Sequence, residues 1–472
     1  APRSGQRHNY DCQHFLDCSG ARGHGRLALA RRLGRYGCRS VAVVFFGKAR
    51  PDGMSGTSKS TVYRSLHILF LTENFPPETN AAATRVYERA CYWAKWGHEV
   101  TVLTCAPNFP EGKIYPGYVN SWRQTEEMDG LRVVRVKTYM SANQGTVRRT
   151  LDFLSFMVSA FFAGLFERRP DVIAATSPQF FAAVGAWALS VVRRIPFVFE
   201  LGDLWPASII AVGAMPPSLG LRLMERLELF LYRRSAAIVA LTNAFKNNLT
   251  RRGIDTDKIT VVINGVDTWR YGPRKADPKL AAETGLKDRF VVGYVGTHGM
   301  AHGLANVLDA AEKLQDDDNI AFLLAGGGAE RESLIADAKR RGLDNVIFLE
   351  RQPKERMPAV WSLCSIALVH LKNSEAFRDV IPSKMFEAMA MGLPILMASP
   401  EGEASAILET EKAGIHVPAE DPAALAEAVR RLASDPALHQ QCAAASLAAA
   451  PNHSREIQAR DMMAVLEQAR RG

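Results

Sequence analysis

The sequence lacks the features that mark a disulfide-rich, zinc-binding or membrane-spanning protein. Three of its seven cysteines lie within residues 1–60, and the other four, Cys91, Cys105, Cys364 and Cys442, are far apart with no CxxC or Cys/His spacing. This usage indicates a reducing compartment and argues against a disulfide framework or a zinc site. A strongly apolar run, residues 150–166, is interrupted by Asp152 and is shorter than the roughly 20 residues that cross a bilayer. We also find no signal peptide, because no small-residue cleavage site follows a compact apolar core.

A net positive charge is confined to one segment. Residues 1–60 hold eleven basic and three acidic side chains, whereas the other residues hold 47 basic and 46 acidic ones, so the net charge of +9 describes the extension. The body of the protein is nearly neutral and gives no reason to expect a nucleic-acid partner. We interpret residues 1–60 as a basic extension outside the folded protein, with residues 1–53 dispensable and Met54 as the alternative start. The other interpretation is a basic tail for an anionic membrane.

An alternation of strand-like and helix-like segments begins at Leu66. The apolar run Leu66–Thr72, the helix-like Ala81–Trp96 and the strand-like Glu99–Thr104 form a βαβ unit, which predicts a parallel sheet with right-handed crossovers. Two series of such segments fill the rest of the chain. Further strands are predicted at Leu131–Val136, Val172–Ala175, Pro196–Glu200, Ala236–Leu241 and Ile259–Ile263 in the first series, and at Phe290–Val295, Ile320–Leu324, Asn345–Leu349, Ser365–Leu371, Pro394–Ala398 and Gly414–Val417 in the second.

We therefore predict an α/β protein with two Rossmann-like, doubly wound domains that face each other across a cleft. The N-terminal domain is expected at residues 61–268 and the C-terminal domain at residues 269–450. Residues 451–472 are expected to form a helix that crosses back to the N-terminal domain. Because open α/β sheets bind ligands beyond the carboxyl ends of their strands, the loops at those ends are the places to look for a site.

In the first half, the loop after the first strand has no G-x-G-x-x-G, which argues against an NAD-dependent dehydrogenase. Asn80 and Arg85 instead suggest a loop that faces a second substrate, and the alternative is a rigid turn into a helix. Asp203 lies among apolar neighbours at a later strand end, beside Trp205. A carboxylate there can orient or deprotonate an acceptor hydroxyl, or it can be a structural helix cap.

In the second half, two glycine-rich loops follow predicted strands. Gly296, with Thr297 beside it, opens a loop that runs to Gly303, and its backbone N–H groups can approach phosphate oxygens. Gly326 and Gly327 follow the next strand, where they leave room for a base or a ribose or simply form a tight turn.

The segment Ile381–Pro394 predicts a short helix, and we expect the rest of the site to be arranged around it. Ser383 is expected to cap its N-terminus and Gly392 to end it. Ser383, Lys384 and Glu387 share one side of the first turn, where free N–H groups and an ammonium suit a diphosphate. Glu387 can accept from ribose hydroxyls. The other interpretation is an amphipathic helix with a Lys-Glu surface pair.

The chain from Leu66 onward resembles glycosyltransferase family 4. The resemblance lies in Gly97-His-Glu-Val-Thr-Val102, Asn264-Gly-Val-Asp267 and Ser383-Lys-Met-Phe-Glu-Ala-Met-Ala-Met-Gly-Leu-Pro394, in that order. It implies a GT-B fold and retaining, metal-independent sugar transfer. Asp203-Leu-Trp-Pro206 and Pro107-Asn-Phe-Pro-Glu-Gly-Lys-Ile-Tyr-Pro116 resemble a branch that builds bacterial surface polysaccharides such as lipopolysaccharide or capsule. Members of that branch use polyprenyl-diphosphate-linked acceptors.

The resemblance also implies roles for single residues. Glu387 matches the second acid of the family's two-acid motif, which binds the ribose, and Asp379 stands at the first, which contacts the donor sugar. Thr297 and His302 occupy the positions of the family's usual Arg and Lys, so neither basic residue is present. The diphosphate is then expected to depend on Lys384, on glycine-loop amides and on a protonated His302.

We therefore expect a glycosyltransferase that uses a UDP- or GDP-sugar, a lipid-linked saccharide acceptor, no metal and no other cofactor. The open alternatives are a nucleotide-sugar epimerase of the same fold and a sugar-nucleotide-binding protein without turnover. Residues 150–166, flanked by arginine pairs, predict either an interfacial helix on anionic lipid or a helix buried against the first sheet. The expected location is the cytoplasm, with the inner face of the cytoplasmic membrane as a possible site of attachment.

Overall fold

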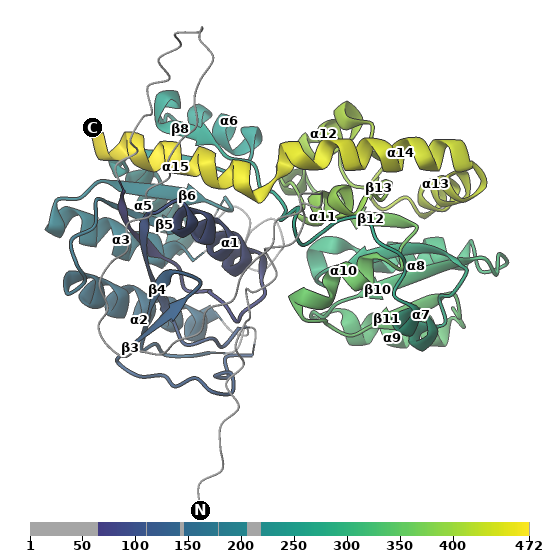
Figure 1. Cartoon of the computed structure of the whole chain (residues 1–472), viewed down its shortest axis with the longest axis horizontal. Helices are drawn as coiled ribbons and strands as arrows, with labels where there is room; N and C mark the ends of the chain where they lie inside the picture. The colour runs from purple at the N-terminus through teal and green to yellow at the C-terminus, as the bar shows by residue number, and fades with distance from the viewer. Residues whose placement is uncertain (1–64, 110, 142–145, 178, 205–218, 472) are drawn as a thin grey trace, which may run out of the picture. The chain divides into compact units, whose positions relative to one another are not determined.

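Two parallel β-sheets with helices on both faces make up the computed structural model of the protein (Figure 1). It describes residues 65–109, 111–141, 146–177, 179–204 and 219–471. The predicted extension, residues 1–60, therefore lies outside the described residues. Both sheets belong to one compact unit that spans residues 63–472. The predicted α/β fold class, with two Rossmann-like sheets, is confirmed.

The first sheet has eight strands in the order β3-β4-β2-β1-β5-β6-β7-β8. All neighbours are parallel except β3, which pairs antiparallel with β4. The sequence prediction missed β3 because its residues, Arg-Gln-Thr-Glu-Glu-Met, include few of the β-branched and apolar residues typical of strands. Its elements are β1 (His67–Leu71), α1 (Ala81–Lys95), β2 (Glu99–Cys105), β3 (Arg123–Met128), β4 (Leu131–Val136), α2 (Thr146–Leu165), β5 (Val172–Thr176), α3 (Phe180–Arg193), β6 (Phe197–Leu201), α5 (Leu219–Arg234), β7 (Ala237–Ala240), α6 (Asn243–Arg251) and β8 (Ile259–Val261).

The second sheet has six parallel strands in the order β11-β10-β9-β12-β13-β14. All six strands coincide with predicted ones to within about two residues. The elements that follow β8 are α7 (Pro278–Thr284), β9 (Phe290–Val295), α8 (Leu304–Glu312), β10 (Ile320–Ala325), α9 (Arg331–Arg340), β11 (Val346–Leu349), α10 (Met357–Trp361), β12 (Ile366–His370), α11 (Lys384–Met391), β13 (Ile395–Ala398), α12 (Glu403–Glu411), β14 (Gly414–Val417), α13 (Pro422–Ser434), α14 (Pro436–Ala449) and α15 (Arg455–Arg471).

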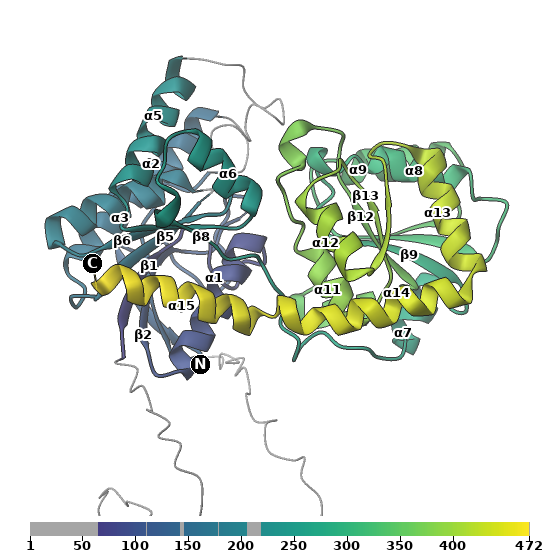
Figure 2. The same cartoon turned by 90° about the horizontal axis from the view of Figure 1, so that it is seen from above.

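Each face of the first sheet has its own hydrophobic core. One core joins the sheet to α2, α3 and α5, and includes Phe156, Leu189 and Leu231. The other joins the sheet to α1 and to α15, which packs along α1 although about 360 residues separate Trp93 from Ala459. Figure 2 shows α15 running along the face opposite α2 and α3. The indole N–H of Trp93 donates to the carbonyl of Ala459 at 2.8 Å, which fixes this contact.

Each sheet has one switch point, which is the place where the strand order reverses and the chain connections turn to opposite sides. In the first sheet this point lies between β1 and β5, and in the second it lies between β9 and β12. Loops at the carboxyl ends of such strands diverge and leave room for a ligand. They begin near Thr72 and Ser177 in the first sheet and near Gly296 and Leu371 in the second.

Candidate functional site

Helix α11 begins at Lys384 and presents its first turn beside the loops of β9 and β12. Gly392 ends it in the left-handed conformation (φ 70°) and donates to the carbonyls of Ala388 and Met389, so the predicted glycine stop is confirmed. The predicted side-chain cap is wrong. Ser383 has helical backbone angles (φ −60°, ψ −25°) and its hydroxyl makes no capping bond. The first-turn N–H groups of α11 therefore have no side-chain cap from Ser383.

The side-chain nitrogen of Lys384, on α11, lies in an unusual environment for a charged group. Its Nζ is buried and has no hydrogen-bond partner among the described residues. It lies 3.6 Å from the ring centroid of Tyr294, on β9. A Cβ at Gly296 would come within 2.9 Å of Nζ, so the absence of a side chain there makes room for the ammonium. Burial lowers the pKa of Lys384 to about 7, although the carboxylate of Glu387 opposes this shift.

Tyr294 is the centre around which the predicted donor residues gather. Its hydroxyl donates to the carbonyl of Thr297 at 2.7 Å, which holds the loop after β9. Its ring lies 5.9 Å from the ring of His302 and under the ammonium of Lys384. The structure thus brings Gly296, Thr297, His302 and Lys384 together, as expected for one pocket, and Tyr294 was missed because its sequence position looks like an ordinary core strand.

The two glycine-rich loops pack directly on each other. The N–H of Gly296 donates to Ala325, and the N–H of His298 donates to Gly327, both at 2.9 Å. A Cβ at Gly326 would lie 1.8 Å from the carbonyl oxygen of Gly296, so only glycine fits there. Gly326 is therefore the tight turn that the sequence analysis left open. At Gly327 the nearest atom to a Cβ would be 3.9 Å away, and this position keeps the space for a ligand.

Two imidazoles in this loop are neutral at physiological pH. Burial and the nearby Lys384 lower the pKa of His302 to about 3. His302 is therefore neutral in the empty site, and its support of the diphosphate, which requires a protonated ring, stays a prediction. His298, which the sequence analysis did not single out, is fully buried, and neither ring nitrogen has a partner among the described residues. Burial, with Arg331 and Lys384, lowers its pKa to about 4. Its position between two glycines at a strand end is the signal that could have identified it.

Arg331 is a second cation that the sequence analysis missed. It opens α9 directly after the loop of β10, and its Nε donates to the carbonyl of Gly326 at 3.2 Å. Its side chain is 16% exposed and pairs with the exposed Glu332 at 3.4 Å. Because it is tied to the glycine loop, its charge is fixed close to His298. The resemblance places the family's basic pair in the loop of β9, so it gives no signal for an arginine at the start of α9.

Glu387 and Asp379 lie on either side of the start of α11. The indole N–H of Trp361 donates to Oε2 of Glu387 at 3.0 Å and fixes the direction of the carboxylate. Burial raises the pKa of Glu387, and the bond from Trp361 opposes the shift. Asp379 is half-buried in the loop before α11, and no hydrogen bond or ion pair joins it to Lys384 or Glu387 within the described part of the chain. The ribose and sugar roles of these two acids remain predictions.

In the first half, Arg85 serves an internal ion pair. It is 5% exposed, and it donates to Glu200 at 3.0 Å and to Thr176 at 3.1 Å. Arg89 makes two further bonds of 2.8 Å to the same carboxylate. Burial alone would raise the pKa of Glu200, but Arg89 and Arg85 lower it to about 2. These bonds occupy the guanidinium, so we leave Arg85 out of the proposed acceptor contacts.

The backbone around Asp203 is held by the loop of β5. The hydroxyl of Ser177 accepts from the N–H of Gly202 at 2.9 Å and of Asp203 at 3.3 Å. A Cβ at Gly202 would lie 2.7 Å from Nη2 of Arg85, which places the Asp203 turn directly over the Arg85 ion pair. Asn80 caps α1, because its Oδ1 accepts from Ala83 at 2.9 Å. The predicted acceptor residue Trp205 lies outside the described residues.

Two buried carboxyl groups meet at the carboxyl end of β1. Asp152, on α2, points inward and is 5% exposed, so it packs inside the protein where the sequence analysis had seen only an interruption of an apolar run. It lies against Glu73, in the loop after β1. Burial raises the pKa of Asp152 to about 6, although the N–H of Ser141 and the charge of Arg149 oppose this. Burial and Asp152 raise the pKa of Glu73 far above its usual range. The pair therefore holds a proton near neutral pH.

Helix α2 combines the two predictions made for residues 150–166. Phe156 is fully buried, and Phe161 packs on the core, so one side of the helix belongs to the fold. Val158, Phe162 and Phe166 are 47%, 56% and 82% exposed on the other side. Among the described residues, no helix combines the length and apolar character that crossing a bilayer requires.

Chemically, the second half offers what a bound anion needs. Lys384 and Arg331 are fixed beside two glycine loops and the N-terminus of a helix, and the Nζ of Lys384 is buried. Charge that develops on a leaving group is strongly stabilised in such a site. Among the described residues, no group of three or more His, Cys, Asp or Glu side chains could hold a metal ion.

Comparison with protein families and known proteins agrees with this chemistry. Residues 80–265 match the model described as "Glycosyl transferase 4-like domain", and residues 277–447 match "Glycosyl transferases group 1". The chain is 27% identical over 338 residues to the "Putative colanic acid biosynthesis glycosyl transferase WcaI" of Escherichia coli, covering 69% of this chain and 82% of that protein. It is 25% identical over 201 residues to "Putative colanic acid biosynthesis glycosyltransferase WcaL" of the same organism, covering 42% and 47%.

Solved structures show the same fold. Sucrose-phosphate synthase from Thermosynechococcus elongatus has a TM-score of 0.69 at 18% identity, over 86% of this chain and 99% of that chain. Anabaena HepE in complex with UDP and glucose has a TM-score of 0.63 at 18% identity, over 85% and 100%. The protein is thus a glycosyltransferase with the GT-B fold. Within that class it belongs with the group 1 and family 4-like enzymes, to which its two halves match.

Proposed function

We propose that this glycosyltransferase moves a sugar, N-acetylated or deoxy, from a UDP- or GDP-sugar to a polyprenyl-diphosphate-linked saccharide. Transfer retains the anomeric configuration and contributes to a bacterial surface polysaccharide. The observation that carries the donor side is the buried Nζ of Lys384, which has no hydrogen-bond partner among the described residues and lies beside interlocked glycine loops. An uncompensated buried cation is costly in an empty site, and a diphosphate is the ligand that would compensate it.

On the donor side, the bond between the anomeric carbon and the diphosphate oxygen breaks. Lys384 and Arg331 would neutralise the negative charge that develops on the departing diphosphate, together with N–H groups of the loop that starts at Gly296. Glu387 would accept from the ribose hydroxyls, held in direction by Trp361. Asp379 would contact the transferred sugar.

On the acceptor side, a hydroxyl oxygen attacks the anomeric carbon from the face that the diphosphate leaves. Asp203, on a turn supported by Ser177, would orient this hydroxyl and take up its proton. Asn80 and Trp205 remain the other proposed acceptor contacts. The printed names of the Escherichia coli relatives support a polysaccharide product, and the UDP complex of HepE supports a uridine donor.

We further propose that the reaction needs no metal and no other cofactor. We also propose that residues 61–268 form the acceptor domain, residues 269–450 the donor domain, and residues 451–472 a helix that returns to the first. The protein would work on the cytoplasmic face of the membrane, with the exposed side of α2 as its contact. Phe162 and Phe166, rather than the buried Phe156, are the side chains that such contact requires.

The purified protein can be incubated with a panel of UDP- and GDP-sugars, with and without a polyprenyl-diphosphate-linked acceptor. We expect release of nucleoside diphosphate that depends on the acceptor and survives EDTA. The anomeric configuration of the product, read by NMR, tests retention. Interconversion of the sugar without acceptor would instead support an epimerase, and tight binding without turnover would support a binding protein.

A further inference from the structure

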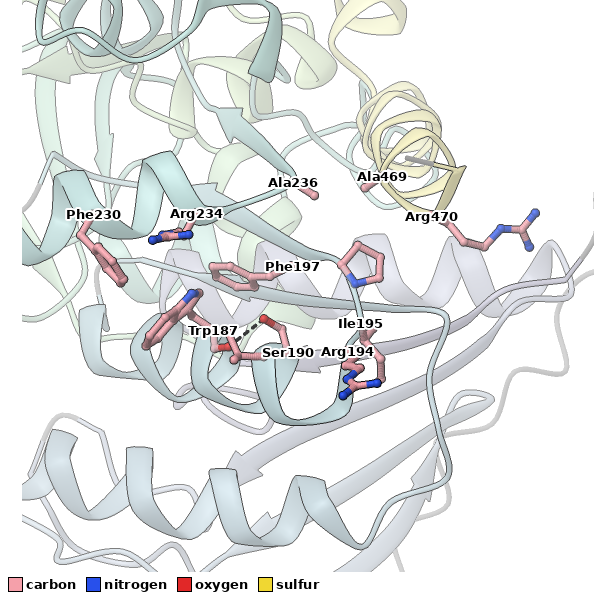
Figure 3. A pocket seen from close by; sticks show the side chains of 12 residues that line it. Trp187, Ser190, Arg194, Ile195, Phe197, Phe230, Arg234, Ala236, Ala469 and Arg470 are labelled. Carbon is pink, nitrogen blue, oxygen red and sulfur yellow. Dashed lines mark hydrogen bonds between the residues drawn. The ribbon is translucent and has the colours of Figure 1, made fainter.

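A cavity of about 590 Å³ lies at the amino ends of strands in the first sheet (Figure 3). The candidate site lies at the opposite, carboxyl ends of the strands. Phe197, at the amino end of β6, and Ala236, just before β7, form its floor. Its walls come from the C-terminal ends of α3, α5 and α15. Donor and acceptor loops leave the carboxyl ends of the strands, so this cavity has no part in the sugar transfer described above.

The cavity joins an aromatic wall to unpaired positive charge. The rings of Trp187 and Phe230 meet edge to face, with 5.0 Å between centroids. The guanidinium of Arg234 lies 5.5 Å from the ring of Phe230, and Arg194 lies on the other side of the opening (Figure 3). Within the described part of the chain, neither Arg194 nor Arg234 forms an ion pair, and none of the twelve lining residues is acidic. The combination suits an anionic head group on an apolar body.

The surface beside the cavity carries exposed apolar side chains and belongs to two helices that are tied together. Arg193, at the end of α3, donates to the carbonyls of Gly164 and Glu167 at 2.7 and 2.8 Å, which fixes it to the end of α2. Val191, which lines the cavity, is 57% exposed. Its neighbour Val192 is 60% exposed, so apolar side chains at the end of α3 border the charged opening, and Arg193 ties that end to the end of α2.

We propose that this cavity binds the phosphate head group of an anionic phospholipid while the exposed apolar side chains of α2 and α3 enter the membrane interface. Two things favour a lipid over a soluble anion. The arginines have an apolar, aromatic floor between them, and the cavity continues through Val191 into an exposed apolar surface. The exposed apolar side chains of α2, Val158 and Phe162, and Phe166 just after the helix form a line along it. A bilayer that contacts this line would leave the loops at the carboxyl ends of the strands accessible to substrates. This proposal rests on the proposed membrane contact and adds a pocket for the lipid head group.

The test is sedimentation of the full protein with phosphatidylcholine vesicles, with or without phosphatidylglycerol. The double variant Arg194→Gln, Arg234→Gln removes two surface charges and should weaken binding to the anionic vesicles about 30-fold, at about 1 kcal/mol for each basic residue near the surface. The matched control is Lys339→Gln, Arg340→Gln on α9, which loses the same charge away from the cavity and should change binding less than about two-fold. A second variant, Phe162→Ser, Phe166→Ser, should weaken binding to both kinds of vesicle.

Equal losses in the two charge variants would overturn the lipid pocket and leave only a general attraction between charges. Loss in the phenylalanine variant alone would overturn the pocket but keep the membrane contact. No sedimentation of the unaltered protein would overturn both. Protection of Arg194 and Arg234 from chemical modification by inorganic phosphate, as strong as by anionic vesicles, would assign the cavity to a free anion. Donor turnover with a water-soluble acceptor should be the same for all variants, which separates this test from that of the proposed function.

Discussion

The loops at the carboxyl ends of the strands differ between the two sheets in how their buried charges are compensated, although both sheets are built in the same way. At the first edge, buried charges compensate each other: Glu200 binds Arg85 and Arg89, and Glu73 shares a proton with Asp152. At the second edge, Lys384 is buried without a partner among the described residues, and its neighbours His298 and His302 are neutral.

We interpret the compensated charges of the first sheet as structural and the uncompensated charge of the second sheet as part of a ligand-binding site. A buried ion pair that is fully hydrogen-bonded needs nothing from outside, and it holds the turn that carries Asp203. A buried ammonium without a partner raises the free energy of the empty site. We infer that substitutions at the first edge mainly reduce stability, whereas those at the second mainly reduce the reaction rate.

The largest expected effect is the loss of the ion pair at the first edge. Glu200→Gln keeps the shape but leaves Arg85 and Arg89 buried without compensation, which should cost about 3–5 kcal/mol of unfolding free energy. Urea denaturation followed by circular dichroism measures this. The control is Glu225→Gln, whose exposed pair with Arg252 should contribute less than about 1 kcal/mol. A loss below that of the control would show that this edge is not a structural cluster.

Next in size is the loss of the free cation at the second edge. Lys384→Met keeps much of the side-chain volume and should slow transfer by about 2 kcal/mol or more in the transition state, roughly 30-fold in kcat/KM. Its thermal stability should be unchanged or higher, because a buried amine is removed. Lys339→Met on α9 is the matched control and should keep full activity. If Lys384→Met turns over within a few-fold of the unaltered enzyme, the ammonium has no part in diphosphate departure.

The smallest expected effect concerns the shared proton at the first edge. The folded protein holds a proton on Asp152 up to about pH 6, whereas the unfolded chain releases it near pH 4. Since the folded state binds more protons in that window, stability should fall as the pH rises from about 4 to 6. Asp152→Asn should flatten this decline and raise stability at pH 7 by about 1 kcal/mol, after allowance for solvent screening. Thermal unfolding from pH 4 to pH 7 measures it, and parallel curves for the two proteins would contradict it.

The sequence predicted the strands of both sheets well, because parallel strands buried on both faces appear as short apolar runs. It missed β3, an edge strand of charged residues. Within the site, it identified Lys384 from its position at the start of a helix, since helix ends can be recognised from local sequence. It could not identify Tyr294 or Arg331, which reach the pocket only through the packing of β9 against β10. It also assigned the internal Arg85 to a loop that faces a second substrate, because its partner Glu200 lies 115 positions away.

Helix α15 makes the order of synthesis differ from the order of folding. The core on the α1 face of the first sheet includes Val86 and Trp93 together with Met462 and Leu466. A growing chain therefore exposes this apolar face while the whole second sheet is being synthesised. Domains normally begin to fold as they emerge from the ribosome. We expect the half-covered sheet to stay exposed until α15 is made, at about 5–20 residues per second of synthesis. The separation of α1 and α15 in the sequence thus sets how long this apolar face stays open to aggregation.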